Sequence, residues 1–234
     1  MDEQVIAAMA RWPNVPDVFG WLSLNEQGQW RLHPAGDALE NDAMPAASGH
    51  HAGLSRGVPM ASPRINQFIN RNYTCDEKGR WYFQNGPQRV FVRLDVAPLI
   101  LHTTDVQLSQ PQFLSHNGLR TSAVTRWCID SQGRLFADTD RGPGLIAGRD
   151  LEQVLGSLRT DDGRDVADVI AACGFPPDGA IQSSNSGTTA RVDAARALAP
   201  AARLVWGDTP AVPLYFCGDD QVAGLFGYVR FPGP

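Results

Sequence analysis

Planar polar side chains and aromatic side chains are concentrated between residues 70 and 94. The polar residues are Asn70, Arg71, Asn72, Gln84, Asn85, Gln88, Arg89 and Arg93, and they are interleaved with the aromatic residues Tyr73, Trp81, Tyr82 and Phe83. Arginine binds carboxylate or phosphate through two parallel hydrogen bonds, and aromatic rings supply apolar contact area. If these side chains converge on one sheet face, they would form a pocket for an anionic or amide-bearing small molecule. We therefore predict a ligand-binding surface made of Asn72, Tyr73, Trp81, Gln84, Gln88 and Arg89.

A structural interpretation of the same residues competes with this prediction. Asn85 would form a turn, and Asn70 and Asn72 would cap the helix that precedes them. Gln88, Arg89 and Arg93 would then be divided between a solvated face and surface ion pairs. Because turns, caps and surface pairs are the commonest uses of these residue types, this interpretation has the greater weight.

No motif for nucleophilic or metal-assisted catalysis occurs in the chain. The patterns G-x-S-x-G, H-E-x-x-H and S-x-x-K with K-T-G are all absent. Three histidines, His33, His102 and His116, lie near expected strands. Any of them could meet Asp105, Asp130 or a cysteine in the fold, and the sequence leaves this open.

Two further segments contain groups that could bind an ion. His50-His51 lies in a loop without Cys, Asp or Glu ligands at fixed spacing, so a solvated loop is favoured over a metal site. Residues 182–189 precede an expected helix and could cradle a phosphate at its N-terminus. They lack the lysine and the spacing of a P-loop, so a capped helix is favoured. We predict no metal and no cofactor.

Turn signals indicate how the polar cluster is positioned. Asp76-x-x-Gly79 has the form of a type I turn, and Asn85-Gly86 is a two-residue hairpin signal, so residues 73–94 should form an antiparallel meander. The first turn form recurs as Asn25-x-x-Gly28 and Asp130-x-x-Gly133, at a spacing of about fifty residues. Because the segments between these turns do not resemble one another, we expect three similar hairpins in one sheet system and no true repeat fold.

The remaining periodicities complete an α+β fold in one domain. Residues 2–12 and the segment that Ser62-Pro63 opens have helical apolar spacing. We expect short flanking helices around antiparallel hairpins that form the main sheet. The predicted parts are 1–141, rich in hairpins with a mobile loop at 34–60; 142–200, mainly helical; and 201–234, returning to strands.

Composition restricts the class of protein. With 43% hydrophobic and 19% charged residues the chain is globular, and its net charge of −5 disfavours binding to nucleic acid or anionic membranes. The longest apolar run, residues 96–101, is too short to span a bilayer, and the N-terminus does not resemble a secretory signal. The four cysteines are widely spaced, as is typical of reduced, buried thiols. We expect a soluble cytoplasmic protein.

Two parts of the first hundred residues resemble a known family. Residues 8–16 with 20–22, and residues 68–73 with 79–90, are similar to a family of uncharacterised proteobacterial proteins described only as a domain of unknown function. The resemblance implies a bacterial cytoplasmic protein. It implies no activity, cofactor or catalytic residue.

Three hypotheses about function follow. The first is a non-catalytic accessory protein whose Arg/Asn/Gln and aromatic face binds a small anionic ligand or a protein partner. The alternative is an enzyme acting on a small anionic metabolite, with a His or Cys brought near Arg89. The third is a structural subunit that assembles through exposed hairpin edges. The sequence leaves the oligomeric state open.

Overall fold

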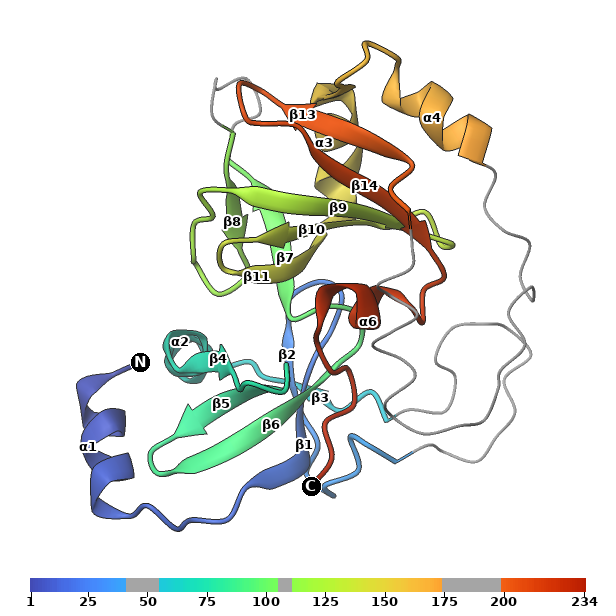
Figure 1. The fold of residues 1–234 in the computed structure, drawn as a ribbon. Coiled ribbons are helices and arrows are strands. Elements are labelled where there is room, and N and C mark those ends of the chain that lie inside the picture. Colours follow the sequence, from blue (N-terminus) through green and yellow to red (C-terminus); the bar gives the residue numbers. More distant parts are fainter. Residues whose placement is uncertain (41–54, 105–110, 174–198) are drawn as a thin grey trace. The chain divides into compact units, whose positions relative to one another are not determined.

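The computed structural model describes residues 1–40, 55–104, 111–173 and 199–234, and these residues form an α+β fold, as predicted (Figure 1). The chain divides into two compact units. Unit 1 comprises Met1–Pro98 and Tyr228–Pro234, and unit 2 comprises Leu99–Gly227. That both fold as a single domain stays a prediction. Among the described residues, no helix has the length and apolar character needed to cross a membrane.

Unit 1 contains a six-stranded sheet in the order β3-β2-β1-β6-β5-β4. Its strands are β1 (Val18–Leu24), β2 (Trp30–Leu32), β3 (Val58–Pro59), β4 (Tyr73–Cys75), β5 (Trp81–Asn85) and β6 (Gln88–Leu94). Its helices are α1 (Glu3–Arg11) and α2 (Pro63–Arg71). The meander predicted from the two turn signals is β4-β5-β6. Within the expected loop at 34–60, the short strand β3 pairs with β2, and residues 41–54 lie outside the described part.

Helix α2 follows from its sequence. Ser62 and Pro63 begin it with a favourable first turn, and Ile69 is buried. At its end, the Asn72 side-chain amide donates a hydrogen bond of 2.9 Å to the carbonyl of Phe68, which has no partner within the helix. This confirms that Asn72 caps the helix, whereas Asn70 lies within α2 and its Oδ1 accepts from Trp30 Nε1 at 2.7 Å.

Unit 2 contains an eight-stranded sheet in the order β12-β13-β14-β9-β10-β11-β7-β8. The strands are β7 (Leu99–Thr103), β8 (Phe113–Ser115), β9 (Val124–Asp130), β10 (Leu135–Thr139), β11 (Gly142–Ile146), β12 (Leu158–Thr160), β13 (Ala202–Trp206) and β14 (Val212–Cys217). The helical elements are η1 (Gly148–Asp150), α3 (Leu151–Ser157), α4 (Val166–Cys173) and α6 (Val222–Phe226). The segment expected to be helical thus begins with a strand, because residues 142–146 pair on both sides with neighbouring strands. Most of the helix expected near 189–199 lies outside the described residues.

The predicted antiparallel hairpins are present, and both sheets are mixed because they also contain parallel pairs. β1 runs parallel to β6 in unit 1, and in unit 2 β11 runs parallel to β7 and β14 to β9. Parallel neighbours come from strands far apart in the chain, whereas the turn signals report only consecutive strands. The expectation that all three hairpins belong to the same sheet is wrong, because they are divided between two sheets.

A five-strand arrangement occurs in both units. In unit 1 the hairpin β1-β2 is followed by the meander β4-β5-β6, and β6 returns parallel to β1. In unit 2 the pair β7-β8 is followed by the meander β9-β10-β11, and β11 returns parallel to β7. The strand orders β2-β1-β6-β5-β4 and β8-β7-β11-β10-β9 therefore correspond strand by strand. The turn patterns in the sequence do not by themselves predict this repetition.

The three predicted turns also share their hydrogen bonds. The Oδ1 atoms of Asn25, Asp76 and Asp130 each accept from the backbone N–H groups two and four residues later, at 2.8–3.1 Å. Gly28, Gly79 and Gly133 all have positive φ, between 73° and 78°, which an L side chain rarely adopts. The Asx-and-glycine pattern therefore predicted the turns correctly.

Candidate binding surface on unit 1

Two aromatic residues of the predicted ligand surface belong to the core. Tyr73 and Trp81 are each 6% exposed, and their ring centroids lie 4.9 Å apart. The Tyr73 hydroxyl donates to the carbonyl of Pro98 at 3.1 Å, and its ring meets Trp30 edge-on. Burial raises the pKa of Tyr73 well above its ordinary value. Both side chains are thus turned into the unit.

The two buried amides of the predicted surface have partners inside the protein. Asn72 and Gln84 are each 1% exposed. Asn72 Oδ1 accepts from the backbone N–H of Asp2 at 2.8 Å, which joins the start of α1 to the end of α2. Gln84 Nε2 donates to the carbonyl of Gly86 at 2.8 Å and steadies the turn between β5 and β6.

Gln88 and Arg89 keep partial exposure and join β6 to the connector before β1. Arg89 forms a two-bond ion pair with Asp17, with N–O distances of 2.8 and 2.9 Å. Gln88 Nε2 donates to the carbonyl of Pro16 at 3.3 Å. The six predicted residues therefore do not gather on one open face, and their role in ligand binding stays a prediction.

A serine, a histidine and an aspartate lie in line inside unit 1. Ser23 Oγ is 2.8 Å from His33 Nε2, and His33 Nδ1 is 3.7 Å from Asp37 Oδ1. This order of groups occurs in nucleophilic catalysis. Ser23 and His33 have no exposed surface, however, and a Cβ added to Gly57 would lie 2.7 Å from His33 Nε2. Burial lowers the pKa of His33, so the network holds a neutral imidazole and has no open approach for a substrate.

The histidines of unit 2 occupy different surroundings. His102 Nδ1 lies 3.3 Å from Asp150 Oδ2 and 3.1 Å from a guanidinium nitrogen of Arg149. His116 Nδ1 accepts from the backbone N–H of Ile100, and burial lowers the pKa of His116 to about 3. The predicted alternative Asp105 lies outside the described residues. No group of three or more His, Cys, Asp or Glu side chains in the described ranges could hold a metal ion.

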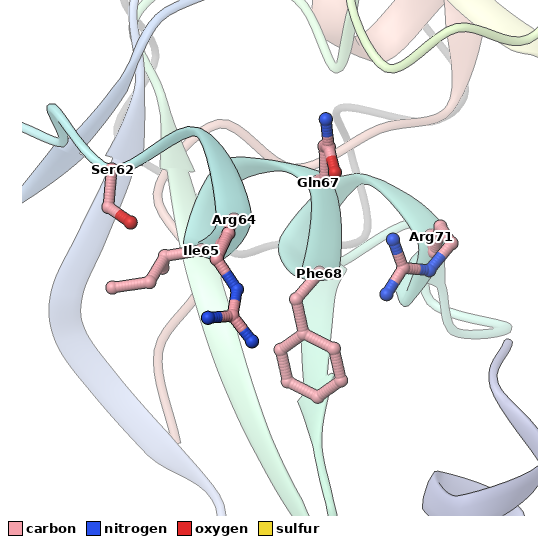
Figure 2. A pocket seen from close by; sticks show the side chains of 6 residues that line it. All are labelled: Ser62, Arg64, Ile65, Gln67, Phe68 and Arg71. Atoms are coloured by element: carbon pink, nitrogen blue, oxygen red, sulfur yellow. The ribbon is translucent and has the colours of Figure 1, made fainter.

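An open hollow lies along the exposed face of α2 (Figure 2). Its volume is about 570 Å³, and it is lined by Ser62, Arg64, Ile65, Gln67, Phe68 and Arg71. Ile65 is 47% exposed. The Phe68 ring is half-buried and meets Phe83 of β5 edge-on, with centroids 5.5 Å apart. The lining of the hollow thus combines the apolar side chains of Ile65 and Phe68 with two guanidinium groups.

The two arginines of the hollow differ in how their charge is used. Arg71 forms an ion pair with Asp2 at 3.0 Å, and this contact raises the pKa of Arg71 and lowers that of Asp2. Around Arg64, no carboxylate lies within ion-pair distance in the described ranges. The hollow therefore has a positive charge at Arg64 that the described part of unit 1 leaves available to an incoming anion.

Arg71 belongs to the polar cluster identified from the sequence, whereas Arg64, Ile65 and Gln67 were not among the predicted binding residues. Arg64, Phe68 and Arg71 follow the i, i+4, i+7 spacing that places side chains on one face of a helix. That spacing was present in the sequence, but the helical apolar spacing of this segment equally fits a face that packs on the core, so the sequence did not show which face stays exposed.

Comparisons with known proteins give a family. The DUF2944 family model, described as a protein of unknown function (DUF2946), matches residues 1–232. Similar solved structures include a DUF1285 family protein from Silicibacter pomeroyi DSS-3, with 16% identity, a TM-score of 0.43, and coverage of 70% of this chain and 88% of that chain. Another is a DUF1285 family protein from Shewanella baltica OS155, with 11% identity, a TM-score of 0.40, and coverage of 58% and 91%. The comparison with curated proteins found no match.

Proposed function

The chain belongs to the DUF2944 family, and from the geometry of unit 1 we propose that it is a non-catalytic accessory protein that binds an anionic group in the α2 hollow. The observation that carries the proposal is the exposed guanidinium of Arg64 beside the apolar side chains of Ile65 and Phe68 (Figure 2). We place the protein in a bacterial cytoplasm, in keeping with the family resemblance of its first hundred residues.

The chemistry of the hollow selects the ligand class. A guanidinium recognises carboxylate and phosphate through charge-assisted hydrogen bonds. Such hydrogen bonds are stronger where part of the contact is shielded from water than where it is fully solvated. Phe68 and Ile65 would contact an apolar portion of the same ligand. A volume of about 570 Å³ lies within the range of small-molecule sites. An anionic ligand with an attached ring or short chain fits these features.

Arg71 would act differently from Arg64. Its ion pair with Asp2 fixes the guanidinium at one end of the hollow and also ties α1 to α2. Arg71 is therefore a positioning residue for the wall of the hollow, whereas Arg64 supplies the contact to the anion.

The test uses phenyl phosphate as a probe and the full chain. We expect calorimetric titration to give binding that Arg64→Glu weakens by about tenfold or more, because the substitution replaces attraction by repulsion. Arg120→Glu, at another exposed arginine, makes the same charge change in unit 2 and should leave binding unaltered. Benzyl alcohol, which lacks the anion, should bind detectably less than phenyl phosphate.

Two results would contradict the proposal. One is a wild-type chain that does not bind phenyl phosphate at millimolar concentration. The other is equal weakening by Arg64→Glu and Arg120→Glu, which would indicate a general effect of net charge.

A further inference from the structure

Two buried sulfur atoms meet in the sheet of unit 2. Cys128 lies on β9 and Cys217 at the end of β14, and their Sγ atoms are 2.9 Å apart. Cys128 has no exposed surface and Cys217 is 3% exposed. Neither thiol takes part in the hollow on α2, so the pair is a separate feature of the molecule.

The strand register explains why the sulfurs meet. β14 runs parallel to β9 with Tyr215 opposite Cys128, and Cys217 follows Tyr215 by two residues. Side chains two apart on a strand point to the same face of the sheet, so both sulfurs lie on one face as diagonal neighbours. Non-bonded carbon atoms rest roughly 3.5–4.0 Å apart and sulfur is larger, so this contact is closer than two independent thiols adopt. A disulfide bond measures about 2.05 Å.

We infer that Cys128 and Cys217 are a modification site, at which a reversible disulfide links β9 to β14 when the protein meets a disulfide oxidant of the glutathione class. The reaction is two successive exchanges. The Cys217 thiolate attacks one sulfur of glutathione disulfide and releases one glutathione. The Cys128 thiolate then attacks Cys217 Sγ and releases the second. Each cysteine loses one proton, the protein is oxidised by two electrons, and glutathione disulfide is reduced to two glutathione molecules.

Burial sets the rate of this reaction. The thiolate is the attacking species, and the environment of Cys128, with Cys217 and Asp130 nearby, raises the pKa of its thiol. Oxidant must also reach Cys217 through local opening of β14 from β9. We therefore expect slow oxidation in the folded protein, slow reduction afterwards, and a bond that closes a long loop and raises the melting temperature.

The test uses a full-length chain with Cys75→Ser and Cys173→Ser, which leaves only the pair. After incubation with glutathione disulfide and trapping with N-ethylmaleimide in denaturant, we expect intact mass to fall by about 2 Da with no maleimide added. The same chain with Cys128→Ser added is the control, and it should gain one glutathione or one maleimide.

Peptide mapping of the oxidised wild-type protein gives an independent measurement if the serine variants fold poorly. We expect a disulfide-linked pair of peptides that contain Cys128 and Cys217. Two maleimides on the double variant after oxidation at a temperature that permits local opening, or mapped bonds that join other cysteines, would overturn the inference.

Discussion

Units 1 and 2 share a five-strand arrangement and differ in what adjoins its outer strand. In unit 2 the outer strand β9 pairs with β14, so the sheet continues, and these two strands contribute the buried cysteine pair on one face of the sheet. In unit 1 the corresponding strand is β4, which α2 enters directly, and β4 ends the sheet formed by the described residues. In unit 2 the sulfur pair lies where β14 extends the shared strands, and in unit 1 the hollow lies on α2, which precedes β4 in the chain.

The matching turns sharpen this comparison. Asp76 with Arg80 and Asp130 with Arg134 form the same i, i+4 ion pair, with N–O distances of 2.9 and 2.6 Å. The Asp130 side chain has no exposed surface, whereas that of Asp76 is 14% exposed. In unit 2, Arg134 also lies 3.7 Å from Asp219, which follows β14. The continuation of the sheet therefore buries the turn more deeply in unit 2.

The largest expected effect comes from the buried aromatic residue three positions before each turn. Trp127→Ala should lower the free energy of unfolding by about 3–5 kcal/mol, because a fully buried ring leaves a cavity. At the equivalent position of unit 1, the milder change Tyr73→Phe removes only the hydroxyl contact to Pro98 and should lower the free energy of unfolding by about 1 kcal/mol. Urea unfolding of both variants measures the difference. Equal losses would contradict the expectation that the cavity left by the Trp127 ring costs more than the lost Tyr73 hydroxyl contact.

The next largest effect is the difference in stability lost when the aspartate of each turn is replaced. Asp130→Ala should lower the free energy of unfolding by about 2–4 kcal/mol, because it leaves two backbone N–H groups and Arg134 without their buried acceptor. Asp76→Ala should lower it by about 1–2 kcal/mol, since water can reach part of that turn. The comparison uses the same denaturation assay. A larger loss for Asp76→Ala would contradict it.

Acid should destabilise the protein through its buried histidines. The pKa values of His33 and His116 are lowered from the ordinary value of 6.5, so as the pH falls below 6.5 the unfolded chain binds protons that the folded chain excludes. The free energy of unfolding should therefore fall with decreasing pH, and His116 contributes up to about 1.4 kcal/mol per pH unit down to about pH 3. Urea unfolding across this range, repeated with His116→Gln, should show a shallower slope for the variant. An unchanged slope would contradict the role of His116.

The smallest effects separate binding from stability within unit 1. Arg89→Ala should lower the free energy of unfolding by about 1 kcal/mol or less, because it removes a partly exposed ion pair with Asp17. Arg64→Ala should leave stability within about 0.5 kcal/mol of wild type, because the guanidinium is exposed. Phenyl phosphate titration should show the reverse order, with only Arg64→Ala weakening binding. Weaker binding by Arg89→Ala would instead support the ligand surface predicted from the sequence.

Local features of the fold were predictable and long-range features were not. Asp76-x-x-Gly79, Asp130-x-x-Gly133 and Ser62-Pro63 determine nearby backbone, so their turns and helix start were predicted correctly. The parallel pairings join strands separated by many residues, such as Val18 with Val90, and no local pattern specifies them. The contact between His102 and Asp150 is of the same kind, since it depends on how β7 and η1 pack.

The candidate site shows a second limit of sequence reasoning. The planar polar residues at 70–94 form caps, turns and ion pairs within unit 1, as Asn72, Gln84 and Arg89 show, and their role in ligand binding stays a prediction. To predict the hollow, one must know which face of α2 stays exposed. Composition cannot distinguish that face from the buried one until the packing partner, here Phe83 against Phe68, is known.

An NMR titration of the full chain with phenyl phosphate tests whether the anion binds in the α2 hollow, because it shows which unit contains the perturbed residues. We expect chemical-shift changes concentrated on residues 62–71 and absent from β9 and β14. Changes concentrated on unit 2, or none anywhere at saturating probe, would contradict the assignment of α2 as the binding element.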